Sequence, residues 1–144
     1  FSEGWALYAE QLALEAGLAD NHLDELGILQ SELFRAVRLV VDTGMHYKRW
    51  TREKAMAYMK AKTGMSDTEV RVEIERYIVW PAQALSYKVG MIKILELRKK
   101  AQDALGEKFN IKDFHSALLD HGSPPLFIVE EKVNDMINNA KSLN

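Results

Sequence analysis

Apolar residues recur at helical spacing from the first residues of the chain. In the segment from about Ser2 to Ala16, one helical face is apolar and a second mixes leucines with two carboxylates. The first face carries Trp5, Tyr8, Leu12 and Ala16, and the second carries Glu3, Leu7, Glu10 and Leu14. A helix that is apolar on more than one side is usually buried within a larger body. The pattern therefore predicts a buried helix, with Ser2 as its N-cap and Gly17 after its end.

Local signals predict where the later helices begin and end. The second helical stretch begins near Asn21 or Asp24 and runs towards Gly44. For the remaining helices, the start signals are Thr51, the Ser66–Glu69 capping box, Asn110 and the prolines of "SPPL", and the stop signals are Gly64, Leu105 with Gly106, and Gly122. A kink or a new helix start is expected at Pro81, because a proline inside a helix removes a hydrogen bond and clashes one turn back.

These elements predict an all-α fold of about six or seven helices. No segment shows the alternation of a strand, and no linker or repeat divides the chain, so we expect residues 1–144 to form a single helical domain.

Charge and composition exclude several classes of protein. The formal net charge is −2 and the Lys and Arg residues are scattered, whereas a nucleic-acid-binding face needs concentrated positive charge. The chain contains no cysteine, which excludes disulfides, thiolate metal sites and cysteine nucleophiles. Apolar runs such as "IVWPAQAL" fall well short of the roughly 20 residues of a membrane-spanning helix. We therefore expect neither a nucleic-acid partner nor a membrane span, and the oligomeric state stays open.

Two glutamates lie among apolar residues in the first helix. Glu3 and Glu10 are seven residues apart and so project from the same face, two turns apart. A carboxylate among Trp and Leu side chains is costly unless it is paired, hydrogen-bonded or bound to a metal. The alternative, that both glutamates face solvent or form ion pairs, stays open on spacing alone.

Two further stretches carry candidate polar groups. In "RAVRLVVDTGMH", Arg38 and Asp42 have the i, i+4 spacing of an ion pair, and His46 follows at another such step if the helix continues past Gly44. An aspartate that orients a histidine is common at catalytic and metal sites. A structural Arg–Asp pair with a histidine at a helix end is an equally good interpretation.

The second of these stretches, "RYIVWPAQALSYKVG", places Tyr77, Gln83 and Tyr87 around the proline break. A tyrosine hydroxyl that faces a cleft can donate to an oxyanion, although aromatic residues at helical spacing are more often core packing. The other histidines, His22, His115 and His121, are not expected to be catalytic, and His22 and His115 have surface-like neighbours.

Known catalytic motifs are missing from the chain. It contains no His-Glu-x-x-His zinc helix, no Gly-x-Ser-x-Gly nucleophile turn and no phosphate-binding glycine loop.

Four segments, taken together, resemble a known family. They are "SEGWALYAE", "RLVVDTGMHYKRWTREKA", "RYIVWPAQALSYKVG" and "FHSALLDHGSPPLFIVEEKV". Their order and spacing are similar to the C-terminal portion of the bacterial domain-of-unknown-function 885 (DUF885) family, which resembles metal-dependent peptidases related to the zincins. The resemblance implies a helical, gluzincin-like protein that is considerably longer than this chain. An upstream His-Glu-x-x-Pro-Gly-His segment would supply two histidine ligands and a glutamate base.

The resemblance also implies functions for individual residues. Glu3 matches the glutamate of the family's Glu-Gly-Trp-Ala stretch and is the expected third ligand of a zinc ion. His46 matches the histidine of the Asp-x-Gly-x-His pattern and Tyr87 the tyrosine of the Gln-Ala-Leu-Ser-Tyr pattern; both are catalytic candidates for contact with a substrate carbonyl or oxyanion. Residues expected to contact substrate or support these groups are Glu10, Arg38, Asp42, Tyr77 and Gln83.

One departure is Pro81-Ala82-Gln83, where the family often has Pro-Gly-Gln. Because alanine favours a helix more than glycine does, we expect this change to matter little.

The activity implied by the resemblance is zinc-dependent hydrolysis of peptide bonds by the longer protein. This chain lacks the histidine segment, so we expect a C-terminal fragment that by itself neither binds catalytic zinc tightly nor cleaves peptides. Its partners would be a peptide substrate and the missing N-terminal part of the same protein. The rival interpretation is a non-catalytic binding or scaffolding module that kept the fold. A periplasmic or extracellular location rests on the resemblance alone.

Overall fold

The computed structural model describes residues 1–142, which form helices joined by short connections. The seven α-helices of this range are α1 (Ser2–Glu15), α2 (His22–His46), α3 (Arg52–Thr63), α4 (Asp67–Val79), α5 (Ser86–Leu105), α6 (Ile111–Leu119) and α7 (Leu126–Ser142), with the 3-10 turns η1 (Gln83–Leu85) and η2 (Gly106–Lys108). No strand occurs among these residues, so the all-α prediction is confirmed. No helix within residues 1–142 has the length and apolar character needed to cross a membrane.

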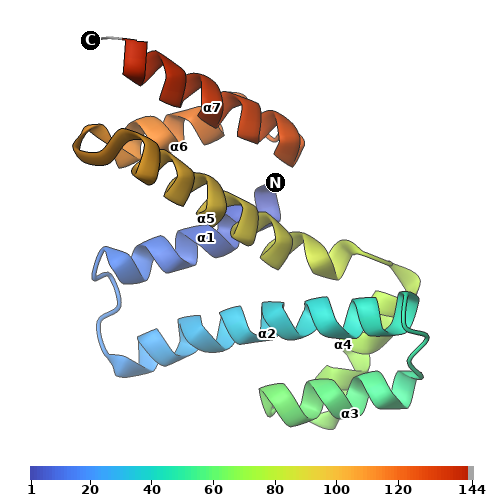
Figure 1. Cartoon of the computed structure of the whole chain (residues 1–144). Coiled ribbons are helices and arrows are strands. Elements are labelled where there is room, and N and C mark those ends of the chain that lie inside the picture. The colour runs from blue at the N-terminus through green and yellow to red at the C-terminus, as the bar shows by residue number, and fades with distance from the viewer. Residues whose placement is uncertain (143–144) are drawn as a thin grey trace.

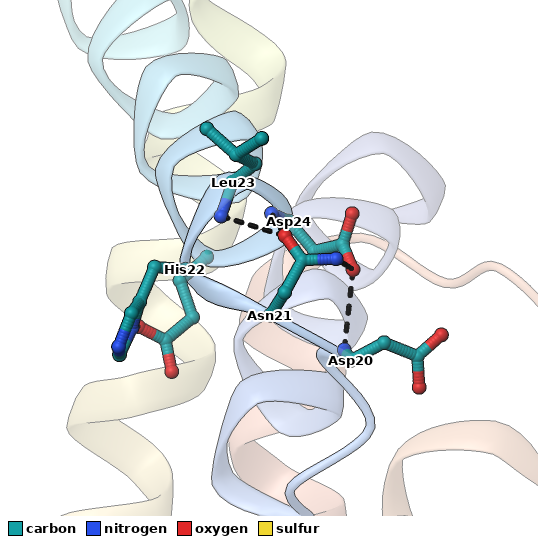
Figure 2. A network of polar contacts seen from close by, with 6 residues as sticks. Asp20, Asn21, His22, Leu23 and Asp24 are labelled. Atoms are coloured by element: carbon teal, nitrogen blue, oxygen red, sulfur yellow. Dashed lines mark hydrogen bonds and ion pairs between the residues drawn. The ribbon is translucent and has the colours of Figure 1, made fainter.

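The side chain of Asn21 caps the N-terminus of α2 (Figure 2). The Asn21 side-chain oxygen accepts hydrogen bonds from the backbone N–H groups of Leu23 at 2.8 Å and Asp24 at 3.2 Å. The Asp24 carboxylate in turn accepts from the Asn21 amide at 2.9 Å and from the Asp20 backbone N–H at 3.2 Å. These bonds satisfy N–H groups that have no partner inside the helix, which explains why the chain turns helical here.

Most of the other predicted helix ends are confirmed. Thr51 caps α3, and Ser66 with Glu69 forms a complete capping box at the start of α4. The first helix differs from its prediction, because Phe1 occupies the N-cap position. The Ser2 hydroxyl instead lies 2.8 Å from the hydroxyl of Ser123, in the loop between α6 and α7.

Two clusters of buried side chains form the interior. One lies between α1, α5, α6 and α7, and the other between α2, α3, α4 and η1. In Figure 1, α1 and α5 lie between the α6–α7 pair and α2, and α3 lies on the far side of α2. The region where α1, α5 and α2 meet therefore joins the two clusters.

Two glycines bring the backbones of α1 and α5 into contact. A Cβ atom built on Gly4 would lie 2.4 Å from the Cα of Gly90, and one built on Gly90 would lie 2.7 Å from the Cα of Gly4. Farther along, Arg98 Nη1 of α5 pairs with Glu15 Oε2 of α1 at 2.8 Å, so the two helices run in the same direction. This contact fixes the first turn of α1, which carries Glu3, against the first turns of α5.

The predicted break at Pro81 is confirmed, since α4 ends at Val79 and α5 begins at Ser86. Between them, Ala82 has a φ of 69° and a ψ of −14°, in the left-handed region. The helix preference on which the expectation for alanine rested does not apply, because residue 82 is not helical. Glycine adopts this conformation without a steric cost, whereas a Cβ atom makes it unfavourable.

Candidate functional site

Five polar side chains follow one face of α2. They are spaced three or four residues apart and form what we call the polar row: Glu32, Arg35, Arg38, Asp42 and His46. Arg38 and Asp42 are each only 2% exposed. Burial of ionised groups is costly unless they are paired or hydrogen-bonded, so their partners decide what this face can do.

The buried Arg38 guanidinium contacts neutral groups from α4, η1 and α5. Its Nη2 donates to the side-chain oxygen of Gln83 at 2.9 Å. Its guanidinium carbon lies 4.7 Å from the ring centroid of Tyr87 and 5.3 Å from that of Tyr77. Burial lowers the pKa of Arg38, and the positive charge of Arg35 adds to this effect. Arg38 thus connects three of the residues selected from the sequence, Gln83, Tyr77 and Tyr87.

Asp42 does not pair with Arg38 as the i, i+4 spacing suggested. Its two carboxylate oxygens accept from the backbone N–H of Ala82, at 3.1 and 3.3 Å. No ion pair joins Asp42 to Arg38 among the residues described. Asp42 therefore holds the strained turn before η1 and so positions Gln83, one residue further on.

His46 lies exposed at the end of α2, which continues past Gly44. Its Nε2 donates to the backbone carbonyl of Tyr77 at 2.9 Å, so this nitrogen carries the proton. Asp42 and His46 therefore do not pair with each other as the sequence suggested. Asp42 accepts from the backbone N–H of Ala82, and His46 donates to the backbone carbonyl of Tyr77. Eight residues separate Arg38 from His46, which is about 12 Å along the helix axis, so His46 lies well beyond the level of Tyr87.

The two tyrosines differ in the state of their hydroxyl groups. The Tyr77 hydroxyl, in a fully buried side chain, donates to the Glu73 carboxylate. Burial and this hydrogen bond raise the pKa of Tyr77 far above its ordinary value. Tyr87 is half-buried, and its hydroxyl makes no hydrogen bond with any described residue. Tyr87 therefore has a free donor and Tyr77 does not.

Glu3 and Glu10 lie on the face of α1 that is turned towards α2 and α5. Glu10 lines a small cavity of about 20 Å³ together with Glu32 of α2 and Met91 of α5. Glu3 lies two turns before Glu10 on this face and is half-buried beside the Gly4 contact. Neither glutamate forms a hydrogen bond or an ion pair with the rest of the described chain. Of the alternatives left open by the spacing, ion pairing is therefore not seen for either residue, whereas both side chains keep part of their surface exposed.

The described residues do not by themselves form a complete metal site. No three His, Asp or Glu side chains within residues 1–142 come together in a way that could hold a metal ion. A catalytic zinc site uses three protein ligands. Of these three, the described residues could supply one carboxylate, that of Glu3.

Several polar groups of the region were not selected from the sequence. Arg35 lies three residues before Arg38, and Glu32 lies three residues before Arg35, on the same face of α2. Following this helical spacing from Arg38 towards the N-terminus would have found both residues. Lys88, which pairs with Glu32, could not be found this way because the two are 56 residues apart.

His115 was also misjudged. Its surroundings are not surface-like, because its Nε2 lies 3.0 Å from the hydroxyl of Tyr8 and its ring packs edge-on against Trp5.

Comparisons with known proteins place these residues in a family context. A search of curated proteins finds no match. A similar solved structure, "the putative lipoprotein from Colwellia psychrerythraea", has 54% sequence identity and a TM-score of 0.93 over 95% of this chain. The match spans only 24% of that protein's chain. The family model described as "Bacterial protein of unknown function (DUF885)" matches residues 1–133. Because this match includes nearly all of its residues, the chain belongs to the bacterial DUF885 family.

Proposed function

We propose that this chain is the C-terminal part of a zinc-dependent peptidase, in which Glu3 binds the metal and Tyr87 and His46 contact the peptide. The observation that carries the proposal is the state of Glu3. It is a half-buried carboxylate without an ion pair, fixed by the Gly4–Gly90 contact on the α1 face that is turned towards the polar row. A carboxylate in such a position is stabilised when a cation binds to it.

The remaining metal ligands would come from outside these 144 residues. In the family pattern they are the two histidines of the His-Glu-x-x-Pro-Gly-His segment, and the glutamate of that segment would act as the general base without binding the metal. A bound zinc ion would supply an activated water and polarise the scissile carbonyl.

The residues of this chain would orient the peptide and stabilise charge. The free Tyr87 hydroxyl would donate to an oxyanion, because its ring is held against Arg38 and its donor has no other partner. Asp42 and Gln83 would keep the turn before α5 and the Arg38 guanidinium in place. His46, about 12 Å from Arg38 along α2, would contact a more distant part of the peptide.

The same proposal includes export from the cytoplasm. It is supported by the similarity to the Colwellia psychrerythraea protein, which is described as "the putative lipoprotein".

The test is Glu3→Gln in the longer polypeptide. Zinc content and peptidase activity should fall together, because the amide is a much weaker ligand than the carboxylate. Glu25→Gln, an exposed substitution in the first turn of α2, serves as a matched control and should change neither quantity. If Glu3→Gln retains one zinc per chain and full activity, Glu3 is not a ligand. If the parent gene lacks the two upstream histidines, the chain belongs to a non-catalytic module.

A further inference from the structure

Within residues 1–142, arginines stack on tyrosine rings at three places. Arg98 lies over Tyr8 at 5.8 Å from the ring centroid, and Arg76 lies over Tyr77 at 5.5 Å. At the third place Arg35 lies at 4.6 Å and Arg38 at 4.7 Å from the centroid of Tyr87, and Arg38 also lies 5.3 Å from the centroid of Tyr77.

At the first two places a carboxylate neutralises the guanidinium. Glu15 pairs with Arg98 at 2.8 Å, and Glu73 pairs with Arg76 at 2.9 Å. No carboxylate of the described residues pairs with Arg35 or Arg38. Arg35 also makes no hydrogen bond to any described residue. The third place thus holds two positive charges without an anion.

The acids on the polar row and on α4 have other partners. On the polar row, Glu32 pairs with Lys88 and Asp42 accepts from the backbone of Ala82. Across from it, Glu73 binds Arg76 and the Tyr77 hydroxyl. Glu3, on the facing side of α1, makes no pair with either arginine and is the metal ligand in the proposed function.

An arrangement of this kind favours an incoming carboxylate. Two neighbouring guanidiniums repel each other, and burial increases the cost of each charge that lacks a counter-charge. The planar fork of an arginine matches the two oxygens of a carboxylate. The half-buried Arg35 and Tyr87 are open to solvent on one side, while Arg38 lies beneath them at 2% exposure.

We propose that Arg35 and Arg38, stacked on the ring of Tyr87, form a binding site for a carboxylate of the peptide substrate, supplied by its C-terminus or by an acidic side chain. The site extends the proposed peptidase function by naming a group that the substrate carries. Its test requires neither zinc nor turnover, so its failure is distinguishable from failure of the peptidase proposal.

The test is an NMR titration of the chain in which the Nε–H signals of its arginines are monitored. The probes are N-acetyl-Ala-Ala with a free C-terminus, N-acetyl-Glu-amide with a side-chain carboxylate, N-acetyl-Ala-Ala-amide with neither, and inorganic phosphate. Saturable shifts of the Arg35 and Arg38 signals are expected with one or both carboxylates and not with the amide. The tighter of the two carboxylates identifies the source.

Substitutions make the assignment specific. Arg35→Gln should weaken carboxylate binding about tenfold or more, as expected for loss of a charge-assisted hydrogen bond. Arg35→Lys, which keeps the charge and so guards against a folding defect, should also weaken it because lysine lacks the planar fork. Arg98→Gln is the matched control, since Arg98 stacks on a tyrosine but already has Glu15 as its carboxylate.

Four results would each overturn the site. They are an absence of saturable shifts with both carboxylates, equal shifts with the amide peptide, tighter binding of phosphate than of either carboxylate, and unchanged affinity in both Arg35 variants.

Discussion

Ala82 is a residue at which local preference and tertiary structure conflict. Its φ of 69° is unfavourable for an alanine, and its N–H is held by the buried Asp42 carboxylate. A non-glycine residue in this region costs on the order of 1–3 kcal/mol. The Asp42 hydrogen bonds and the Pro81 break impose the conformation in spite of that cost.

The first prediction concerns this position. Ala82→Gly should raise the free energy of unfolding by about 1 kcal/mol, since the relief of strain exceeds the roughly 0.5–1 kcal/mol entropic cost of a glycine. Ala57→Gly, in the exposed interior of α3, should lower it by a similar amount. Urea unfolding of both variants measures the two free energies. A loss of stability in Ala82→Gly would contradict the claim that the backbone of Ala82 is strained.

The second prediction concerns pH and His115. Burial, and then the charge of Arg98, lower the pKa of His115 from 6.5. The unfolded chain therefore binds more protons at this residue, so stability is lost as the pH falls below about 6.5 towards the folded pKa. His115→Gln should remove this part of the pH dependence and leave the profile above pH 7 parallel to that of the wild type. Identical slopes between pH 5 and 6.5 would refute it.

At the residue scale, sequence reasoning identified polar groups but not their partners. It selected Arg38 and Asp42 in one stretch and Gln83 in another, and it paired Arg38 with Asp42. The actual partner of Arg38 is 45 residues away in the chain, and the partner of Asp42 is a backbone N–H 40 residues away. Spacing along one helix carries no information about such contacts.

Helix ends were predictable because their signals are local. Asn21, Thr51 and the Ser66–Glu69 box each bond to backbone groups within three residues, so the sequence alone contains the interaction. The contact between α1 and α5 was not predictable in this way. Gly4 and Gly90 are ordinary helical residues until two helices 86 positions apart meet there.

The third prediction tests this contact between elements. Gly4→Ala and Gly90→Ala should each lower the free energy of unfolding by about 2–3 kcal/mol, because the new methyl group overlaps the facing backbone. Gly27→Ala is the matched control: it lies within α2 with no atom within 4 Å of the added methyl, and it should stabilise the protein by about 0.5–1 kcal/mol. Thermal or urea unfolding measures all three variants. Equal effects at Gly4 and Gly27 would contradict the backbone contact.

At the scale of the whole molecule, the candidate site lies where the two apolar clusters meet. Tyr87 packs against the cluster of α1, α5, α6 and α7, and its ring also contacts Arg35 and Arg38 of α2. The all-α class and the number of helices followed from periodicity, which each helix carries by itself. The meeting of α1, α2 and α5 around Tyr87 depends on packing between distant segments. Spacing within each segment could therefore select candidate residues, but it could not show that they come together.

The most direct test of the account is Tyr87→Phe in the longer polypeptide. If the Tyr87 hydroxyl donates to an oxyanion, kcat for peptide hydrolysis should fall about 100-fold or more, as when one oxyanion donor is removed from other hydrolases. Zinc content should be unchanged, and Tyr47→Phe, at a side chain 75% exposed, should retain full kcat. A Tyr87→Phe enzyme with full kcat and unchanged zinc content would contradict the assignment of this face to the substrate.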